Sequence, residues 1–375
     1  MSKVSIVKCT DYNTANVEEA VMRSVDLLGG IGQFIMPGDK VLLKPNLLSA
    51  RKPDDAVCTH PELVRAVIRV VKKVSNNIMI GDSPGSFFMI KDINHVLEKT
   101  GLRRIADEEG VEIIKFDKSG IINGYPIADA VMKADKVITI PKLKTHALTA
   151  MTGAIKNSFG MVPGLFKLDC HRNHPDPKHF VATIVDVFEV RRPDIAIMDA
   201  IVGMEGNGPA AGNPKRIGYV IAGRDSVSVD SVASEIIGIP AHKNIIINEA
   251  VSRKAGEGVL HHIEIVGEKL ADAKLKRFKL PVTTLMTSHS INMLPDFLYK
   301  MFSRLIAFRP VIDEAICKKC NICKNACPVD AITITEERSL INAKRCIRCF
   351  CCHEACPYKS IYIRKNFITN ILWRK

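Results

Sequence analysis

The sequence predicts an α/β fold, in which a domain with a largely parallel sheet is followed by a small α+β domain rich in cysteine. Two observations support this division. Short apolar runs alternate with helical patterns over residues 1–270, as in domains built from successive strand and helix units. Nine of the twelve cysteines of the 375-residue chain then fall within residues 317–356. The second region therefore has a chemistry that the first lacks.

Each element of the first domain is predicted from a local pattern. Asn16, followed three residues later by Glu19, predicts a helix start, and Gly29-Gly30 predicts its end. Short apolar runs between polar residues predict strands at Val4–Val7, Val41–Lys44, Ile78–Ile80, Ile113–Phe116, Val137–Ile140, Ile195–Met198 and Tyr219–Ala222. Further helices are predicted at Pro61–Val74, Ser226–Ile237 and His242–Lys254.

The domain boundaries follow from changes in this pattern. We expect the α/β domain at 1–270, a linker at 271–310, the cysteine-rich domain at 311–365 and a tail at 366–375. Prolines interrupt the linker, and its stretch 297–308 predicts a short amphipathic helix. Such a helix either contacts a membrane surface or packs the small domain onto the large one; its shortness favours packing.

Composition excludes several classes of protein. The N-terminus has no signal-peptide pattern, and no apolar stretch is long enough to span a bilayer, so we expect a cytoplasmic protein without a transmembrane segment. The formal net charge of +13 comes with a single Trp and no recognised nucleic-acid motif. We therefore expect no nucleic acid, and favour an acidic partner or an anionic ligand.

Two cysteine runs carry the strongest signal. Cys317, Cys320, Cys323 and Cys327 form one run, and a shift of 29 residues gives the second, which consists of Cys346, Cys349, Cys352 and Cys356. Both have the spacing C-x2-C-x2-C-x3-C-P, which holds [4Fe–4S] clusters in bacterial ferredoxins. Disulfides would need an oxidising compartment, and zinc would favour two separated C-x2-C pairs. The spacing therefore predicts two [4Fe–4S] clusters.

The ligands are expected to cross between the runs. Three thiolates in a tight loop reach three corners of one cluster, and the fourth, turned away by its proline, reaches the other. This predicts one cluster on Cys317, Cys320, Cys323 and Cys356, and a second on Cys346, Cys349, Cys352 and Cys327. Cys351 is expected to be a spectator thiol. Residues 311–365 thus resemble the bacterial two-[4Fe–4S] ferredoxin module, with Asn321 and Phe350 where glycine is common. Because Phe adopts positive φ poorly, we expect the second loop to differ in backbone.

Polar residues follow several predicted strands of the first domain. They are Lys44-Pro45-Asn46, Gly81-Asp82-Ser83, Pro141-Lys142-Leu143-Lys144-Thr145-His146, and Asp199 with Met204-Glu205-Gly206-Asn207-Gly208-Pro209. In open α/β sheets, ligands bind at the carboxyl ends of strands, so these residues are candidates for one crevice. The alternative is that each of these residues only forms a turn, because loops at strand ends require turn-forming residues.

These segments, with Gly153-Ala154-Ile155-Lys156-Asn157 and Cys349-Phe350-Cys351-Cys352, together resemble the domain of unknown function 362 family. The resemblance covers nearly the whole chain. It implies an iron–sulfur redox protein with a C-terminal two-cluster ferredoxin module, and it implies no agreed reaction.

The leading hypothesis is an iron–sulfur oxidoreductase that transfers electrons through its clusters, exchanging them with a redox partner protein and a small anionic molecule. Lys142, Lys144 and Lys156 would hold the anion, His146 would exchange protons, and Asp82 and Glu205 would orient them. The alternatives are a non-catalytic electron carrier or docking protein, and a cofactor-maturation factor. A mononuclear metal site among Asp169, Cys170, His171, His174, Asp176 and His179 is a weaker hypothesis, because Pro175 and Pro177 break any helical spacing.

Overall fold

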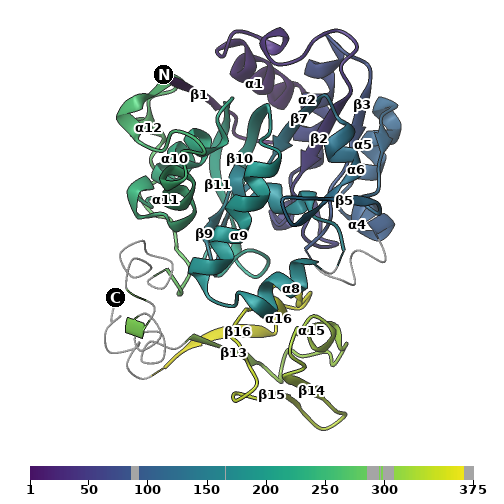
Figure 1. Ribbon diagram of the computed structural model, residues 1–375, viewed down its shortest axis with the longest axis vertical. Helices are drawn as coiled ribbons and strands as arrows, with labels where there is room; N and C mark the ends of the chain where they lie inside the picture. The colour runs from purple at the N-terminus through teal and green to yellow at the C-terminus, as the bar shows by residue number, and fades with distance from the viewer. Residues whose placement is uncertain (86–92, 165, 285–294, 296, 299–307, 367–375) are drawn as a thin grey trace.

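The computed structural model describes residues 1–85, 93–164, 166–284, 295, 297–298 and 308–366. A large α/β domain forms the upper part of the molecule in Figure 1, and a small module, residues 308–366, lies below it. The predicted fold class is confirmed: a mostly parallel sheet flanked by helices precedes a small α+β module. The predicted helix at 297–308 lies almost wholly outside the described residues, and the bounds of the four predicted segments stay predictions.

One sheet organises the large domain, with the order β12-β1-β11-β10-β7-β2-β3-β4 among the described residues. The strands β7, β2, β3 and β4 are parallel to their neighbours, and β11 is antiparallel to both β1 and β10. Two short strands branch from the middle of the sheet, where β8 pairs in parallel with β10 and antiparallel with β9. The strands are β1 Ser2–Lys8, β2 Val41–Pro45, β3 Ile78–Ile80, β4 Glu112–Ile113, β7 Lys136–Ile140, β8 Lys142–His146, β9 Ala150–Thr152, β10 Ile195–Glu205, β11 Asn213–Gly223 and β12 Ile263–Gly267.

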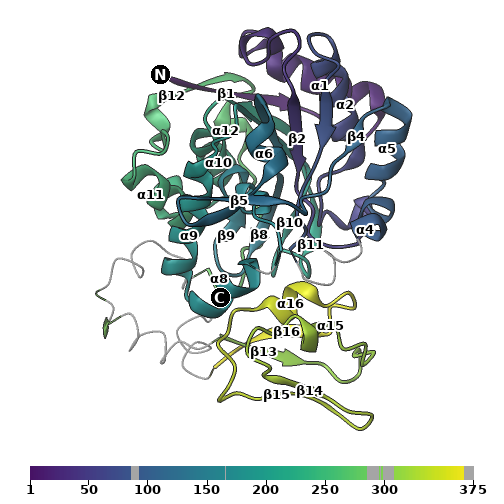
Figure 2. The same ribbon diagram turned by 45° about the vertical axis from the view of Figure 1, so that its right-hand side comes forward.

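Helices cover both faces of this sheet, as Figures 1 and 2 show. Alternate residues of a strand pack on opposite faces: Val41 and Leu43 lie in one core and Leu42 in another. A small β5–β6 hairpin (Ser119–Ile122, Tyr125–Ala128) lies outside the sheet. The helices are α1 Thr14–Asp26, α2 Pro61–Lys72, α4 Ile93–Lys99, α5 Leu102–Glu109, α6 Asp129–Lys133, α7 Ala154–Asn157, α8 Phe166–Asn173, α9 Pro177–Val190, α10 Ser226–Ile236, α11 Ile245–Ser252 and α12 Leu270–Ala273. No described helix is long and apolar enough to cross a bilayer.

Two local predictions were wrong. The first helix begins at Thr14 and is capped by Asn13, whose side chain accepts a hydrogen bond from Ala15 N, so Asn16 lies within the first turn. The segment 142–146 is not a turn after a strand but a strand itself, β8. Its alternation of Lys, Leu, Lys, Thr and His has the period of two that strands show, and the prolines and charges around it hid that signal.

The C-terminal module has an internal repeat. Two antiparallel strand pairs, β13 Phe308–Ile312 with β16 Ile361–Lys365 and β14 Ile332–Ile334 with β15 Ser339–Ile341, accompany the short helices α15 Ile322–Asn325 and α16 Cys351–Ala355. Positive φ values recur with the 29-residue shift: Asn321 has 63° and Phe350 has 61°. The expected difference between the two loops is therefore absent. Burial of the Phe350 ring in an apolar core offsets the unfavourable backbone of this residue.

The module is held beneath the large domain at several points. Arg51 donates to the carbonyl oxygens of Cys356 (2.9 Å) and Pro357 (2.7 Å), and Arg172 donates to the Pro328 carbonyl (2.7 Å). In the other direction, Lys359 donates to the Gly212 carbonyl oxygen at 2.9 Å. Phe308, Phe350 and Ile363 also belong to an apolar core that the large domain supplies. The two bodies thus share one continuous interface.

Candidate functional site at the domain junction

Strand β8 places three predicted residues on one face. Lys142, Lys144 and His146 are two residues apart, so their side chains project to the same side of the strand. All three are buried. They do not form a single group, however, because their partners differ.

Lys142 is satisfied within the large domain. Its Nζ lies 2.8 Å from Asp199 Oδ2 and donates to the Tyr12 hydroxyl at the same distance. Tyr12 in turn donates to Asp199 Oδ1 at 2.7 Å, and its ring stacks on His60 with centroids 3.5 Å apart. Both members of the ion pair are fully buried. The charge of Lys142 is thus matched within the large domain, and its predicted role in anion binding stays a prediction.

A second buried pair joins the ends of β2 and β3. Lys44 Nζ lies 2.7 Å from Asp82 Oδ1, and Asp82 Oδ2 accepts from Leu47 N at 2.7 Å. Gly160 packs directly on the pair, since a Cβ there would lie 2.1 Å from Asp82 Oδ1. Nearby, Lys167 donates to the Ser83 carbonyl, and burial lowers its pKa to about 7. Asp82 is therefore occupied by Lys44 and the backbone.

A different arrangement surrounds the end of β8. His146 Nε2 lies 3.4 Å from Glu354 Oε1, and Glu354 belongs to α16 of the C-terminal module. The negative charge of Glu354 also acts on Lys144 and Lys156, as the electrostatics of both lysines show. We call Lys144, His146, Lys156 and Glu354 the junction site. It combines residues of one strand, β8, and two helices, α7 and α16, and His146 and Glu354 lie about 200 positions apart in the chain.

Burial controls the charges of the junction site. The pKa of Lys144 is lowered to about 8, mainly by burial and also by the positive charges of Lys156 and Lys142, while Cys58 and Glu354 oppose the shift. The pKa of Lys156 is also lowered by burial, with Glu354 opposing. Burial raises the pKa of Glu354 and lowers that of His146 well below its usual range. At neutral pH the site therefore holds a neutral imidazole and two lysines facing one carboxyl.

Several polar atoms of this region lack partners among the described residues. Glu354 Oε1 and His171 Nδ1 are buried without a hydrogen bond. His146 Nδ1 accepts from Leu148 N at 3.1 Å, so the proton of the neutral ring sits on Nε2, which faces Glu354. Lys156 has no hydrogen bond to another described residue; its Nζ lies 5.9 Å from the centre of the Phe180 ring, on which His171 stacks at 4.4 Å. Unpaired buried polar groups of this kind are costly without a ligand or water.

The remaining predicted residue, Glu205, lies at the end of β10 and accepts from Lys279 N at 2.9 Å. No contact between it and the junction site is found among the described residues, and its role stays a prediction. Sequence reasoning missed Glu354 and Lys167, and it named His171 only as a candidate metal ligand. Nothing in the local sequence of α16 marks Glu354, because its importance comes from the packing of the module.

The eight cysteines of the two runs form two sets of neighbours. Burial raises the pKa of Cys323 to about 11, and the thiolates of Cys356, Cys320 and Cys317 add to this shift. The pKa of Cys346 is also raised by burial, and the negative charges of Cys349 and Cys327 add to this shift. One small recess is lined by Cys327, Cys346, Cys349 and Cys352 together, which is the donor set expected for the second cluster. The thiols thus fit two [4Fe–4S] clusters with crossed ligands.

No group of three or more His, Cys, Asp or Glu side chains among the described residues is arranged around a single ion. The eight thiols are consistent with this, because a [4Fe–4S] cluster spreads its four ligands over four iron atoms. The weaker hypothesis of a mononuclear site near His171 finds no support: His179 Nδ1 is instead 2.9 Å from Asp176, and His171 packs on Phe180.

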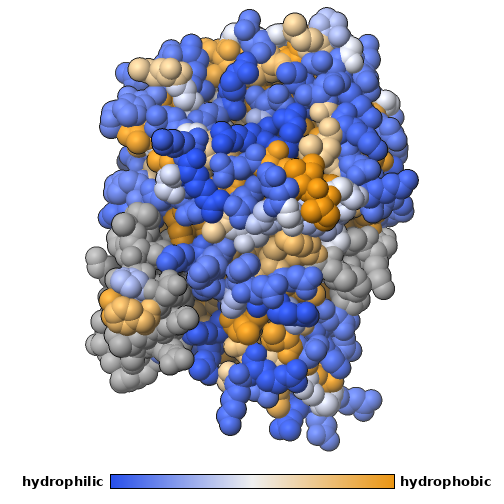
Figure 3. All heavy atoms as spheres, viewed as in Figure 1, coloured by the Kyte–Doolittle hydropathy of each residue, from blue (hydrophilic) through white to orange (hydrophobic). Residues whose placement is uncertain are grey.

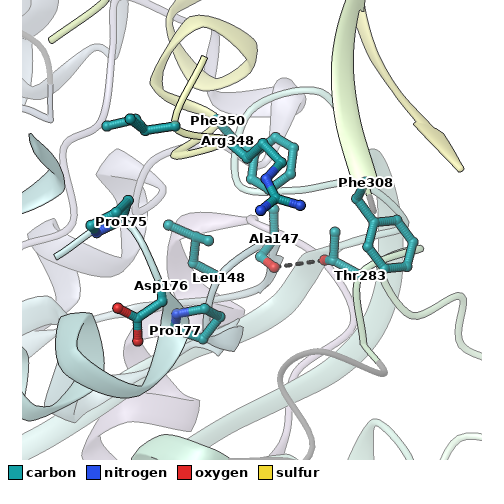
Figure 4. Close-up of a pocket in the computed structure, with 10 residues that line it drawn as sticks. Ala147, Leu148, Pro175, Asp176, Pro177, Thr283, Phe308, Arg348 and Phe350 are labelled. Carbon is teal, nitrogen blue, oxygen red and sulfur yellow. Dashed lines mark hydrogen bonds between the residues drawn. The ribbon is translucent and has the colours of Figure 1, made fainter. Parts of the chain in front are cut away.

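An apolar pocket borders the junction site (Figure 4). It is lined by the turn after β8, the segment that begins α9 and the loop of the second cysteine run, with Leu148, Pro177 and Phe350 as apolar walls. Thr283 closes one side and donates to the Ala147 carbonyl at 2.6 Å. Ala147 directly follows His146, so this recess and the junction site share a strand end.

Comparison with protein families gives two matches. Residues 41–235, about half of the chain, match the domain of unknown function DUF362. The chain belongs to the DUF362 family. Residues 309–357 match a 4Fe-4S dicluster domain, so this DUF362 protein is an iron–sulfur protein with a ferredoxin-type module. The thylakoid-associated protein sll1697 of Synechocystis sp. is 33% identical over 244 residues, which cover 63% of this chain and 75% of that protein.

Solved structures give only distant similarities to this DUF362 protein. The lactate racemase apoprotein from Thermoanaerobacterium thermosaccharolyticum has a TM-score of 0.38 and 12% identity, covering 64% of this chain and 58% of that one. A Thermotoga maritima protein has a TM-score of 0.37 and 12% identity, covering 61% of this chain and 60% of its own length. The chain therefore spans less than two thirds of either protein, and no argument about activity follows from them.

Proposed function

We propose that this DUF362 protein is a redox protein that passes electrons between two [4Fe–4S] clusters and a small anionic molecule held in the junction site. The observation that carries the proposal is the group of buried Lys144 and His146 with half-buried Lys156 and Glu354, which joins the end of β8 to the helix of the second cysteine run. Glu354 is two residues from Cys352, a predicted ligand of the second cluster. A molecule in this site would lie next to that cluster.

The charge of the site favours an anion. Two lysines stand against a single carboxyl, and burial makes an unmatched ammonium group costly. An anion beside Lys144 and Lys156 would remove that cost, and the same low polarity would strengthen the attraction. Glu354 Oε1, which has no hydrogen bond among the described residues, would accept one from a hydroxyl or protonated group of the same molecule.

Each part of the chain would have its own task. When bound, clusters of this type supply one-electron oxidation and reduction. Cys317, Cys320, Cys323 and Cys356 would hold the first, and Cys346, Cys349, Cys352 and Cys327 the second. Lys144 and Lys156 would bind the anion. His146 would donate the proton on Nε2 to the bound molecule or accept a proton from it at the same atom, and Glu354 would orient the ring. The interface between the domains would keep bulk water from the reacting atoms.

The cluster content is tested by iron and sulfide analysis after anaerobic purification. We expect about eight iron atoms per chain, four for each cluster. Replacing Cys327 with Ala should damage the cluster whose other ligands come from the second run and spare the first. Equal loss of both clusters would contradict the crossed ligation, and stoichiometric zinc with little iron would contradict the clusters themselves.

The anion site is tested by thermal unfolding of the iron-loaded protein with phosphate or succinate. A ligand that binds the folded state raises the melting temperature with concentration. The double change of Lys144→Met and Lys156→Met should abolish this rise and leave the iron content unchanged. A control with the same loss of charge, Lys118→Met with Lys276→Met, changes two exposed lysines and should keep it. If the rise survives in the first variant, the anion binds elsewhere and a carrier function gains support.

A further inference from the structure

The two cysteine runs have the same spacing and opposite surroundings. Cys320 of the first run is exposed, whereas its repeat mate Cys349 is buried. Lys324 is exposed, whereas its mate His353 is 1% exposed and its Nε2 lies 3.0 Å from the Asn207 carbonyl oxygen in the large domain. The second run is therefore covered by the large domain, and the first faces solvent.

The exposed part of the first run is basic with an apolar centre. Ile316, which is 45% exposed, and Cys320 lie among Lys318, Lys319 and Lys324, and no acidic residue occurs between positions 316 and 325. The Lys319 side chain donates to the Glu336 carbonyl, while the side chains of Lys318 and Lys324 are exposed and form no hydrogen bond or ion pair with another described residue. We call residues 316–325 the entry face. Its composition, apolar in the middle and charged around it, is typical of a transient interface.

We propose that the entry face is the docking surface for an acidic one-electron carrier protein. The inference rests on the proposed electron transfer through the clusters, and it names the surface at which electrons pass between the carrier and this protein. The reduced carrier would be oxidised by one electron and this protein would be reduced by one electron, and no bond would form or break. The first cluster would exchange electrons with the carrier and the second with the junction site.

Charge complementarity favours an acidic carrier over a basic one. Lysines that are free of local partners attract an acidic surface at long range and raise the association rate. Electron-transfer complexes are small and short-lived, so a few charges around one apolar contact suffice. The buried second run could not serve this purpose, because Phe350, 3% exposed, is packed into the core that the two domains share.

The test measures the reduction of the oxidised, iron-loaded protein by a reduced flavodoxin of net negative charge in stopped-flow experiments. We expect the second-order rate constant to fall as ionic strength rises. The double charge reversal of Lys318→Glu and Lys324→Glu should lower it at least tenfold at low ionic strength. The control pair, Arg338→Glu with Lys344→Glu, makes the same charge change elsewhere in the module, where both residues are exposed, and should slow it less than twofold.

Dithionite reduction separates failure of docking from failure of the proposed function. The entry-face variant should keep its iron and be reduced by dithionite at the rate of the wild type. If the control pair slows the reaction with flavodoxin as much as the entry-face pair, only net charge matters and the docking surface is refuted. Unchanged rates in both variants would refute it as well. If dithionite reduces no cluster in the wild type, the electron-transfer function itself fails.

Discussion

Four lysines close to strand ends of the large domain fall into two kinds. Lys44 and Lys142 each lie 2.7 to 2.8 Å from an aspartate that is buried with them. Lys144 and Lys156 have no such partner in their own domain, and the nearest carboxyl that acts on both, Glu354, comes from the C-terminal module. Lys44, Lys142 and Lys144 are all buried and Lys156 is half-buried, so burial alone does not separate the two kinds.

The difference shows how a buried charge reveals its role. An ion pair enclosed within one domain is complete when that domain folds, and it specifies the packing of strand ends. A lysine whose only nearby carboxyl belongs to the other domain is incompletely neutralised, so binding of an anion beside it is favourable. The first kind is part of the architecture, and the second is a candidate for binding. The free energy of unfolding and its dependence on pH can test this distinction.

The largest effect is expected from Lys44→Met. This change leaves Asp82 buried without its cation, which typically costs about 3 to 5 kcal/mol. Urea unfolding of the iron-loaded protein, followed by circular dichroism, would measure the loss. Adding Asp82→Leu should recover much of it, because the uncompensated charge is then removed as well. If Lys44→Met alone costs less than about 1 kcal/mol, Lys44 does not belong to the architectural kind.

The second prediction concerns Lys144 and pH. Its pKa is about 8 in the folded protein, below the ordinary value of 10.5. Between these values the unfolded chain binds more protons, so the wild type should gain stability as the pH rises from about 8 to 10.5. Lys144→Met lacks this gain, which we expect to be on the order of 1 to 3 kcal/mol. Parallel pH profiles of variant and wild type would show that Lys144 is not destabilised by burial.

A similar cost is expected from Gly160→Ala, which probes the Lys44–Asp82 pair through its packing. The new methyl group would lie 2.1 Å from Asp82 Oδ1 and 2.5 Å from Lys44 Nζ, so the pair must shift. Such overpacking costs about 1 to 3 kcal/mol. The matched control is Gly32→Ala, where no heavy atom lies within 4 Å. Equal midpoints of urea unfolding for the two variants would contradict the close packing of the pair.

The smallest effect is a pH dependence of anion binding. Phosphate or succinate should favour the protonated form of Lys144, so the rise in melting temperature that it causes should shrink as the pH passes above about 8. Differential scanning fluorimetry at a series of pH values would follow this. With Lys142→Arg, which keeps the charge beside Asp199, the profile should be unchanged. A rise that is independent of pH would separate Lys144 from the anion.

The sequence predicted the fold class and the cysteine-rich module well, because apolar runs and cysteine spacing are local signals. Ile78–Ile80 was predicted with the bounds that β3 has. The strand β8 was missed because its Lys142, Lys144 and His146 resemble a polar turn, although all are buried. These polar side chains can be buried only because they have partners elsewhere in the fold, and a local sequence pattern carries no information about those partners.

The candidate site was predicted in part for the same reason. Lys144, His146 and Lys156 come together, but the sequence grouped Lys142 and Asp82 with them. The structure assigns these two to separate ion pairs with Asp199 and Lys44. Glu354 was missed because its place depends on how the module docks. Tertiary packing decides which distant residues pair. That two lysines lie close in the sequence does not show whether they share a partner.

The interface between the domains has one further property. Among the described residues, the hydrogen bonds across it end on main-chain oxygens: Arg51 holds the Cys356-Pro357 end of one run and Arg172 the Pro328 end of the other, while Lys359 and His353 reach Gly212 and Asn207. The contacts of Arg51 and Arg172 recognise the path of the module backbone, whereas those of Lys359 and His353 depend on side chains of the module. A ferredoxin of different reduction potential but the same chain path would offer Arg51 and Arg172 the same acceptors. The two arginines thus fix the course of the module backbone, while Lys359 and His353 tie this particular module to the large domain through their own side chains.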